Sequence, residues 1–373
     1  MLHPAVRRSL VGGATAGLGV LALRALSRPL PDQGDRTLVD WARVQGVAGR
    51  RCGERANVLR GTDELGARYD RHAIEVAPLM EAICQSVPTG FPRFTVLDRR
   101  GFIDTNVRIA QRLLTPVEEL RAHLHESRAT AMGRSMMSRY IGEVFGFISK
   151  RVLGQYDPVL MLSEPLIGET PSLYLVEPNM ARFQRTSGLP AESLHRYLIL
   201  HELTHAWQFG SHPWLRDHIA TVMRDALMTG MLEHAGGRES GPRLPAGNIV
   251  RMMPGHMRLQ LQAVNRIQAV MSVLEGYSNF VMHRVGRRHL ANFDDLERAF
   301  HQRSTQRSTL ERVILTMTGM AMKLRQYELG EQFSVAVTER GGPDLLNRVW
   351  DGPDYLPSMT ELRDPGRWIA RVG

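Results

Sequence analysis

The chain has 373 residues and a net charge of +9, with 43% hydrophobic and 23% charged residues. This composition suits a globular protein with a sizeable core and excludes low-complexity and repeat architectures. Two cysteines, Cys52 and Cys84, are too few for a disulfide framework and form no CxxC pair. The positive charge alone does not indicate a nucleic-acid partner, because no helix-turn-helix or RNA-binding motif accompanies it.

The first 36 residues differ from the rest of the chain. Arg7 and Arg8 precede an apolar, glycine-rich run over residues 10–23, and further arginines and two prolines follow. This order is typical of a signal peptide or a short membrane anchor, although a bilayer span needs about 20 apolar residues. An amphipathic extension is the alternative. The sequence is therefore compatible with three locations: the cytoplasm, a membrane surface and the outside of the cell after export. Residues 1–36 are the segment that would contact a membrane.

Residues 37–373 show mainly the pattern of amphipathic helices. Strand signals are few and fall at residues 94–97, at Phe102 and at residues 172–176, whose sequence is SLYLV. No linker divides this part of the chain, and the glycine-rich segment 236–248 is typical of an exposed loop. Apolar residues three and four positions apart predict helices over residues 71–85, 106–124, 135–153, 194–209, 257–285 and 310–329.

These elements predict one mainly helical α+β domain over residues 37–373. Its body is helical, and its small β-sheet lies beside the helix that includes residues 194–209. Pro190 suits the start of this helix, and Gly210 with Pro213 predicts its end.

A HELTH sequence at residues 201–205 lies inside this helix. His201 and His205 are four residues apart and share one face, so both imidazoles can reach one metal ion. Glu202 lies about 100° round the helix, where its carboxylate can act on a water molecule without being a ligand. A metal that activates this water, with Glu202 as general base, is the chemistry of a zinc hydrolase. A buried His–Glu hydrogen-bond cluster is the alternative.

A catalytic zinc site needs a third protein ligand. The extended pattern HExxHxxGxxH fails, because Gln208 stands at its glycine position and Ser211 at its third histidine. Glu275, between apolar neighbours in the helix predicted over 257–285, is the better ligand, since a carboxylate in such surroundings needs a partner. Four histidines are held in reserve as ligands: His212, His218, His234 and His283.

Further residues near Glu275 are candidates for supporting roles. Asn279, one turn later, is predicted to orient a histidine ligand. Tyr277, His283 and Tyr327 could each donate a hydrogen bond to a developing oxyanion.

Several stretches between residues 39 and 372 match, in order, the pattern of one family. They are VDW at 39–41, RVLGQYD at 151–157, LYLVEPN at 173–179, HELTHAWQF at 201–209, PWLRDHI at 213–219, LEGY at 274–277, QYELGEQF at 326–333, LNRVWDGPDYLP at 346–357 and DPGRWIARV at 364–372. The chain resembles the zincin-like metallopeptidase family often labelled as deazaflavin-coenzyme biosynthesis-associated proteins.

The resemblance implies a zincin-like fold with His201 and His205 as zinc ligands, Glu202 as the catalytic residue and Glu275 as the third ligand. By analogy with that fold, the strand at 172–176 would be an edge strand that lines the cleft and pairs with an extended peptide. The resemblance implies no particular substrate.

Two functions follow from these observations. The first is a Zn²⁺-dependent metallopeptidase or amide hydrolase that acts on a peptide or protein substrate. The alternative is a non-enzymatic scaffold or binding protein, associated with a membrane through residues 1–36, in which the metal is structural. Nucleic acid is not expected as a partner of either.

Overall fold

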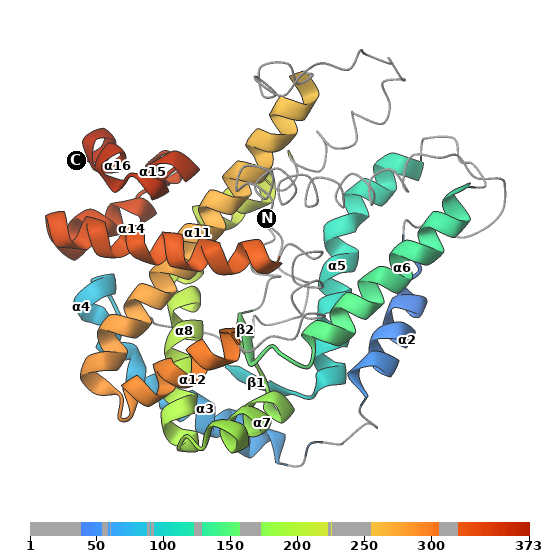
Figure 1. The fold of residues 1–373 in the computed structure, drawn as a ribbon, viewed down its shortest axis with the longest axis horizontal. Coiled ribbons are helices and arrows are strands. Elements are labelled where there is room, and N and C mark those ends of the chain that lie inside the picture. The colour runs from blue at the N-terminus through green and yellow to red at the C-terminus, as the bar shows by residue number, and fades with distance from the viewer. Residues whose placement is uncertain are drawn as a thin grey trace, which may run out of the picture.

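A computed structural model describes residues 39–53, 59, 61–87, 90, 93–122, 129–156, 173–222, 225, 255–305 and 320–373. Residues 1–36, the loop predicted over 236–248 and part of the helix predicted over 310–329 lie outside the described residues. The described part is mainly helical with one small sheet (Figure 1), which confirms the predicted fold class. None of its helices is long and apolar enough to span a bilayer.

Most of the predicted elements are present, with shifted ends. The strand at 94–97 is confirmed, but Phe102 lies in a helix. In chain order the elements are α2 (Trp41–Cys52), α3 (Thr62–Val76), η1 (Ala77–Met80), α4 (Glu81–Cys84), β1 (Phe94–Leu97), α5 (Arg99–Ala122), α6 (Ala129–Ile148), β2 (Gly154–Tyr156), β3 (Leu173–Val176), α7 (Glu177–Ser187), α8 (Ala191–Ser211), α11 (Gly255–His289), α12 (Phe293–Thr305), α14 (Met320–Asn347), η3 (Arg348–Trp350), η4 (Pro353–Tyr355), α15 (Met359–Arg363) and α16 (Pro365–Val372).

Among the described residues the sheet has three strands, in the order β1-β3-β2. β1 runs parallel to β3, with Phe94 opposite Leu173, and β2 runs antiparallel to it, with Gly154 opposite Leu175. The expectation that the strand at 172–176 is an edge strand is therefore wrong, because β3 is paired on both sides. The edge beside α8 is β2, whose three residues are too few to give an alternating pattern in the sequence.

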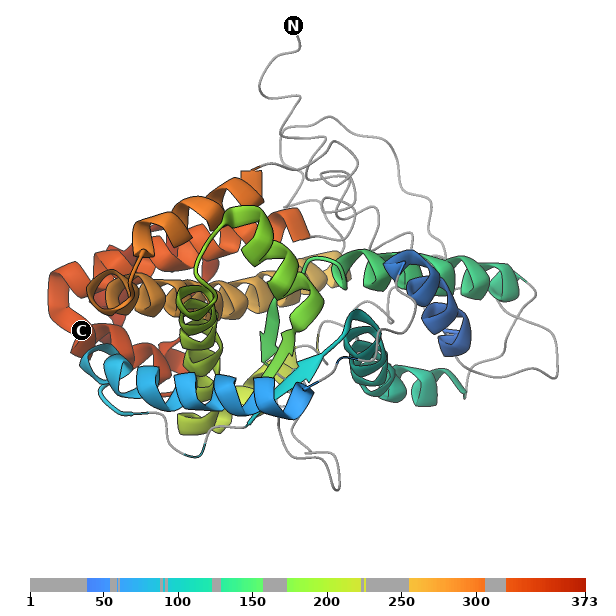
Figure 2. The same cartoon turned by 90° about the horizontal axis from the view of Figure 1, so that it is seen from below.

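Helices on the two sides of this sheet form two groups. α2, α5 and α6 lie on one side, and α8, α11, α14 and the C-terminal helices lie on the other (Figures 1 and 2). The first group has its own apolar cluster, which includes Val44, Ala48 and Val107. The larger core lies between the helices of the second group and includes Tyr277 and Trp368.

The backbones of α11 and α14 touch where the two helices cross. A Cβ at Gly330 would lie 1.8 Å from the carbonyl oxygen of Ser272, and a Cβ at Gly276 would lie 2.2 Å from the carbonyl carbon of Gly330. Side chains at these two positions would therefore hold the helices apart. Because Gly276 directly follows Glu275, this crossing also sets the position of the predicted third ligand.

Candidate metal centre

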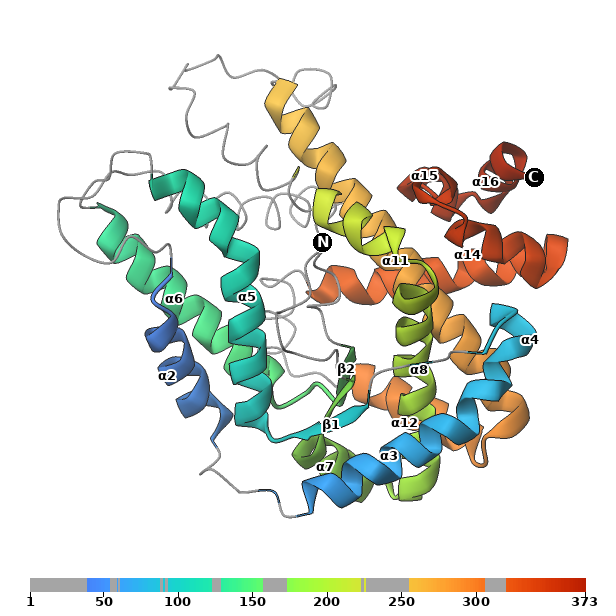
Figure 3. The same ribbon diagram turned by 180° about the vertical axis from the view of Figure 1, so that it is seen from behind.

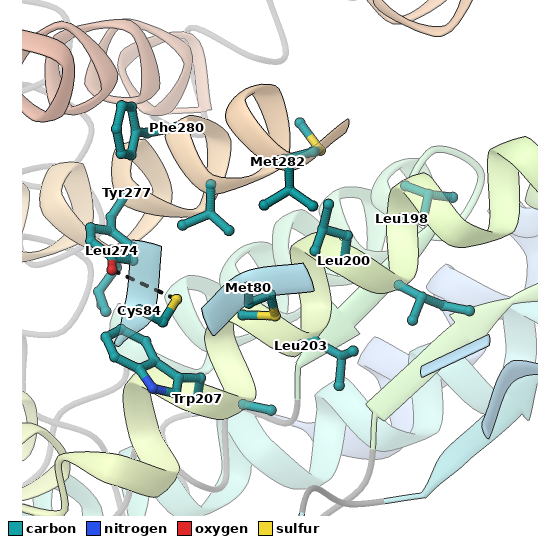
Figure 4. Packing of buried hydrophobic residues seen from close by; sticks show 14 of the residues in the cluster. Met80, Cys84, Leu198, Leu200, Leu203, Trp207, Leu274, Tyr277, Phe280 and Met282 are labelled. Carbon is teal, nitrogen blue, oxygen red and sulfur yellow. Dashed lines mark hydrogen bonds between the residues drawn. The ribbon is translucent and has the colours of Figure 1, made fainter. Parts of the chain in front are cut away.

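The helix that carries the HELTH sequence is surrounded by other elements. α8 contacts α3, β2 and α11 (Figure 3). Leucines and Trp207 of α8 form one apolar cluster with Tyr277 and Phe280 of α11 and with Met80 (Figure 4). The polar residues at 201–205 therefore lie in apolar surroundings, where each needs a partner.

The structure brings His201, His205 and Glu275 together as one group that could hold a metal ion. The Nε2 atoms of the two histidines are 3.2 Å apart, and each lies 3.6 Å from Oε2 of Glu275. Zinc bonds of 2.0–2.2 Å in tetrahedral geometry place neighbouring ligand atoms about 3.3 Å apart. The spacing of the three ligand atoms thus fits a zinc ion.

Gln208 and Ser278 fix the orientation of the His205 ring. The amide nitrogen of Gln208 donates to the carbonyl oxygen of Leu274 at 3.0 Å, so its Oε1 faces Nδ1 of His205 at 2.9 Å. Ser278 Oγ lies 3.3 Å from the same Nδ1 and donates its own proton to Leu274 at 2.9 Å. Since both neighbours accept, Nδ1 carries the proton and the Nε2 lone pair is directed towards Glu275.

The sequence assigns this orienting role to Asn279, but the structure gives it to other residues. In the described part of the chain Asn279 makes no hydrogen bond to either histidine. Ser278 precedes it by one residue, which turns the side chain about 100° round α11 and towards α8. Gln208 could have been found from its spacing, because residues three apart on a helix face one another.

Two carboxylates raise the pKa of His205. Burial on its own lowers this pKa, but the contact with Glu275 and the negative charges of Glu275 and Glu202 outweigh it. Glu202 is 5% exposed and Glu275 is 9% exposed, so neither charge is screened by bulk water. The site therefore attracts a cation.

The carboxylate of Glu202 packs against the first residue of β2. A Cβ at Gly154 would lie 2.8 Å from Oε1 of Glu202 and 2.9 Å from Cδ2 of Leu175. Glycine therefore lets this strand run close to the candidate base. The sequence does not single out Gly154, because nothing in it shows that β2 and α8 meet.

Tyr277 lies in the core and not at the metal centre. It is two residues beyond Glu275, which places it about 200° round α11. Its hydroxyl donates to Oδ1 of Asn347 at 2.7 Å and also lies near Cys84, while its ring stacks on Trp207 (Figure 4). Burial raises its pKa well above the usual value.

His283 belongs to a separate cluster. It lies two turns beyond Glu275, about 12 Å along the helix axis. Its Nε2 is 3.3 Å from Oε1 of Glu297, and its Nδ1 contacts Glu331. These contacts join α11 to α12 and α14.

His212 and His218, two other histidines held in reserve as ligands, also lie outside the group of His201, His205 and Glu275. Nδ1 of His212 donates to the carbonyl oxygen of Gln208 at 3.0 Å, and its ring stacks on Trp350. His218 contacts the ring of Trp214. His234 and the side chain of Tyr327 lie outside the described residues.

A buried histidine of α8, His195, has a strongly perturbed pKa. The ring of His195 lies edge-on to Tyr69 of α3, with centroids 4.9 Å apart, and close to His72. Burial lowers the pKa of His195 to about 4, and the nearby positive charge of Arg68 adds to this effect. The folded protein therefore holds this imidazole neutral.

We expect His195 to destabilise the folded protein as the pH falls from about 6.5 to 4. In this range the unfolded chain binds the proton and the folded chain does not, and the pKa difference corresponds to about 3 kcal/mol. Urea unfolding of the wild type and of His195→Gln at several pH values measures this loss of stability. The free energy of unfolding of the wild type, relative to that of His195→Gln, should decrease as the pH falls towards 4. A pH-independent difference between the two proteins would contradict the assignment.

Comparisons with known proteins agree with this site. A sequence profile of the zincin-like metallopeptidase family matches residues 39–369. The crystal structure of a proposed hydrolase with a novel fold from Chloroflexus aurantiacus is similar, with 32% sequence identity and a TM-score of 0.67, over 89% of this chain and 98% of that one. No curated protein matches the chain. The chain therefore belongs to the zincin-like metallopeptidase family.

Proposed function

We propose that this protein is a zinc-dependent metallopeptidase or amide hydrolase in which His201, His205 and Glu275 hold the ion. The observation that carries the proposal is the spacing of the three ligand atoms, which are 3.2–3.6 Å apart. A zinc ion bound there would polarise a substrate carbonyl and lower the pKa of a water molecule.

In this proposal Glu202 is the general base. It follows the first ligand, does not join the ligand group, and is buried against Gly154. Its carboxylate would take a proton from the attacking water and deliver it to the leaving nitrogen. Gln208 and Ser278 would keep the proton of His205 on Nδ1 throughout.

The edge of β2 supports a peptide substrate. The amide of Val176 donates to the carbonyl oxygen of Leu153 at 2.8 Å. In an antiparallel pair the direction alternates, so the backbone groups of Gly154 and Tyr156 are directed away from β3. An extended peptide could pair with them and bring a scissile bond beside Glu202.

Metal analysis combined with a cleavage screen tests the proposal. We expect about one zinc per chain, lost in His201→Ala and Glu275→Ala and kept in the control Glu192→Ala, whose side chain is exposed on the same helix. The zinc-loaded protein should cleave members of an unstructured peptide library, read by mass spectrometry. Zinc binding without cleavage would favour the scaffold alternative, and zinc retained in both ligand variants would overturn the site.

A methyl group at residue 154 should lower the rate of hydrolysis. In Gly154→Ala the new Cβ would meet the carboxylate of Glu202, which must turn away, and misplacement of a catalytic group by about 1 Å can cost roughly 100-fold. We expect kcat to fall about 10- to 100-fold with zinc content unchanged. Gly49→Ala is the control, because nothing lies within 4 Å of its added Cβ. Equal rates for the two variants would show that β2 does not position the base.

A further inference from the structure

An arginine-lined cavity is formed by residues of α2 and α6. These two helices lie on the opposite side of the sheet from α8 and α11 (Figure 1). Its volume is about 540 Å³. The proposed hydrolase site uses none of its residues. The lining consists of four arginines, one carboxylate and one apolar side chain: Arg43, Arg50, Arg51, Arg139, Glu143 and Val47.

Two of the four arginines have no counter-ion among the residues that the structure describes. Arg43 contacts Asp40, and Arg51 contacts Glu143 at 3.4 Å. Arg50 and Arg139 are exposed and form no ion pair with any residue that the structure describes. The cavity therefore has a positive charge that its own carboxylate does not balance, and its ligand should be an anion.

Lys150 lies near Arg51 of the cavity lining. Burial lowers the pKa of Lys150, and the nearby charges of Arg51, Arg99 and Arg151 lower it further. A guanidinium binds the oxygens of a phosphate through paired N–H donors. The lining is thus suited to a phosphate group.

Apolar side chains are exposed beside the arginines on α6. Met136 is 64% exposed and Tyr140 is 38% exposed, and both lie one turn or less from Arg139. Met136 and Tyr140 are four residues apart and share a helix face. Basic residues flanking exposed apolar and tyrosine side chains are typical of a surface that rests in the headgroup region of a bilayer.

We propose that the α2–α6 face, with Arg50 and Arg139 at its centre, binds the phosphate headgroups of anionic phospholipids at a membrane surface. The position of α2 in the chain supports this, because Trp41 closely follows the basic and apolar segment 1–36. The sequence of that segment by itself predicts contact with a membrane. A soluble phosphate compound or a nucleic acid would not use Met136 and Tyr140 in this way.

Vesicle co-sedimentation of the full chain tests the proposal. The wild type should bind vesicles of phosphatidylcholine mixed with phosphatidylglycerol more tightly than vesicles of phosphatidylcholine alone. In Arg50→Gln/Arg139→Gln we expect binding to the anionic vesicles to weaken about 30-fold, because each arginine near such a surface contributes roughly a fivefold factor. The single variants should each weaken it about fivefold, which keeps the test valid if the double variant is poorly folded.

The matched control is Arg185→Gln/Arg288→Gln. Both residues are exposed arginines without an ion pair among the described residues, on α7 and near the end of α11, and the net charge changes equally. The control should bind anionic vesicles like the wild type. Equal weakening of the two double variants would reduce the effect to net charge and overturn the proposal.

Two further arms distinguish other sources of phosphate. Inorganic phosphate should displace the wild type from anionic vesicles no better than chloride at the same ionic strength. Stronger displacement by phosphate would assign the cavity to a soluble phosphate compound. Tight binding of duplex DNA that is lost in Arg50→Gln/Arg139→Gln, without a preference for anionic vesicles, would assign it to nucleic acid. Either result would overturn the membrane assignment.

Discussion

Replacing Glu202 by glutamine should reduce hydrolysis by about 10²- to 10⁴-fold, the usual contribution of a general base, while the protein keeps its zinc. The amide has nearly the same shape as the carboxylate and can fill the space beside Gly154, but it cannot take a proton at neutral pH. The three ligand side chains are unchanged, so metal content should stay at the wild-type level. Steady-state kinetics on a cleaved peptide and elemental analysis of the same preparation measure both effects.

Glu192→Gln is the matched control for this variant. Glu192 lies in the first turn of the same helix, and its exposed carboxylate contacts Arg196 at 3.3 Å. Loss of such a surface pair changes stability by less than about 1 kcal/mol, and we expect no effect on the rate. If Glu202→Gln retained activity within a few-fold of the control, the general-base role would be lost. If it lost zinc, Glu202 would instead have to support the ligands.

Replacing Gly330 by alanine should destabilise the protein by about 3 kcal/mol or more, the upper range for overpacked sites. The new Cβ would lie 1.8 Å from the carbonyl oxygen of Ser272, and a backbone atom cannot rotate away as a side chain can. α14 must therefore move off α11. Because Glu275 lies on the contacted turn of α11, we also expect zinc affinity to fall about 10- to 100-fold, as when residues that orient ligands are changed. Urea unfolding and zinc competition titrations measure the two effects.

Gly210→Ala separates this contact from the general effect of glycine in helices. Gly210 lies in the last turn of α8, and nothing lies within 4 Å of an added Cβ. Alanine there should be neutral or stabilise the helix by up to about 1 kcal/mol, through its higher helix propensity. Equal stabilities for Gly330→Ala and Gly210→Ala would contradict the close helix crossing.

The helix α8 could be predicted from the sequence because the residues that indicate it are close together in the chain. Pro190 and Gly210 lie at the two ends of α8, and the four-residue spacing of His201 and His205 fixes their common face. The contact of Glu275 with the two histidines could be predicted because a carboxylate among apolar residues needs a partner. In each case the reasoning needs only a few neighbouring residues.

Contacts between segments that are far apart in the chain could not be predicted. Gln208 matters because it reaches the carbonyl oxygen of Leu274, and Gly154 matters because β2 passes Glu202. Neither contact leaves a pattern in the sequence. The central position of β3 was missed for the same reason, since strand order depends on which chain segments meet and not on their composition.

The hydrogen bond from Gln208 to Leu274 joins residues 66 positions apart, and the candidate metal group of His201, His205 and Glu275 spans the same two helices. An ion held by His201, His205 and Glu275 would act as a cross-link that closes this long loop. Closing it restricts the unfolded chain, so zinc affinity becomes part of the folding free energy. Free zinc at about 1,000 times its Kd would add roughly 4 kcal/mol. Chelation should therefore lower the unfolding temperature, which reports on the site without any substrate.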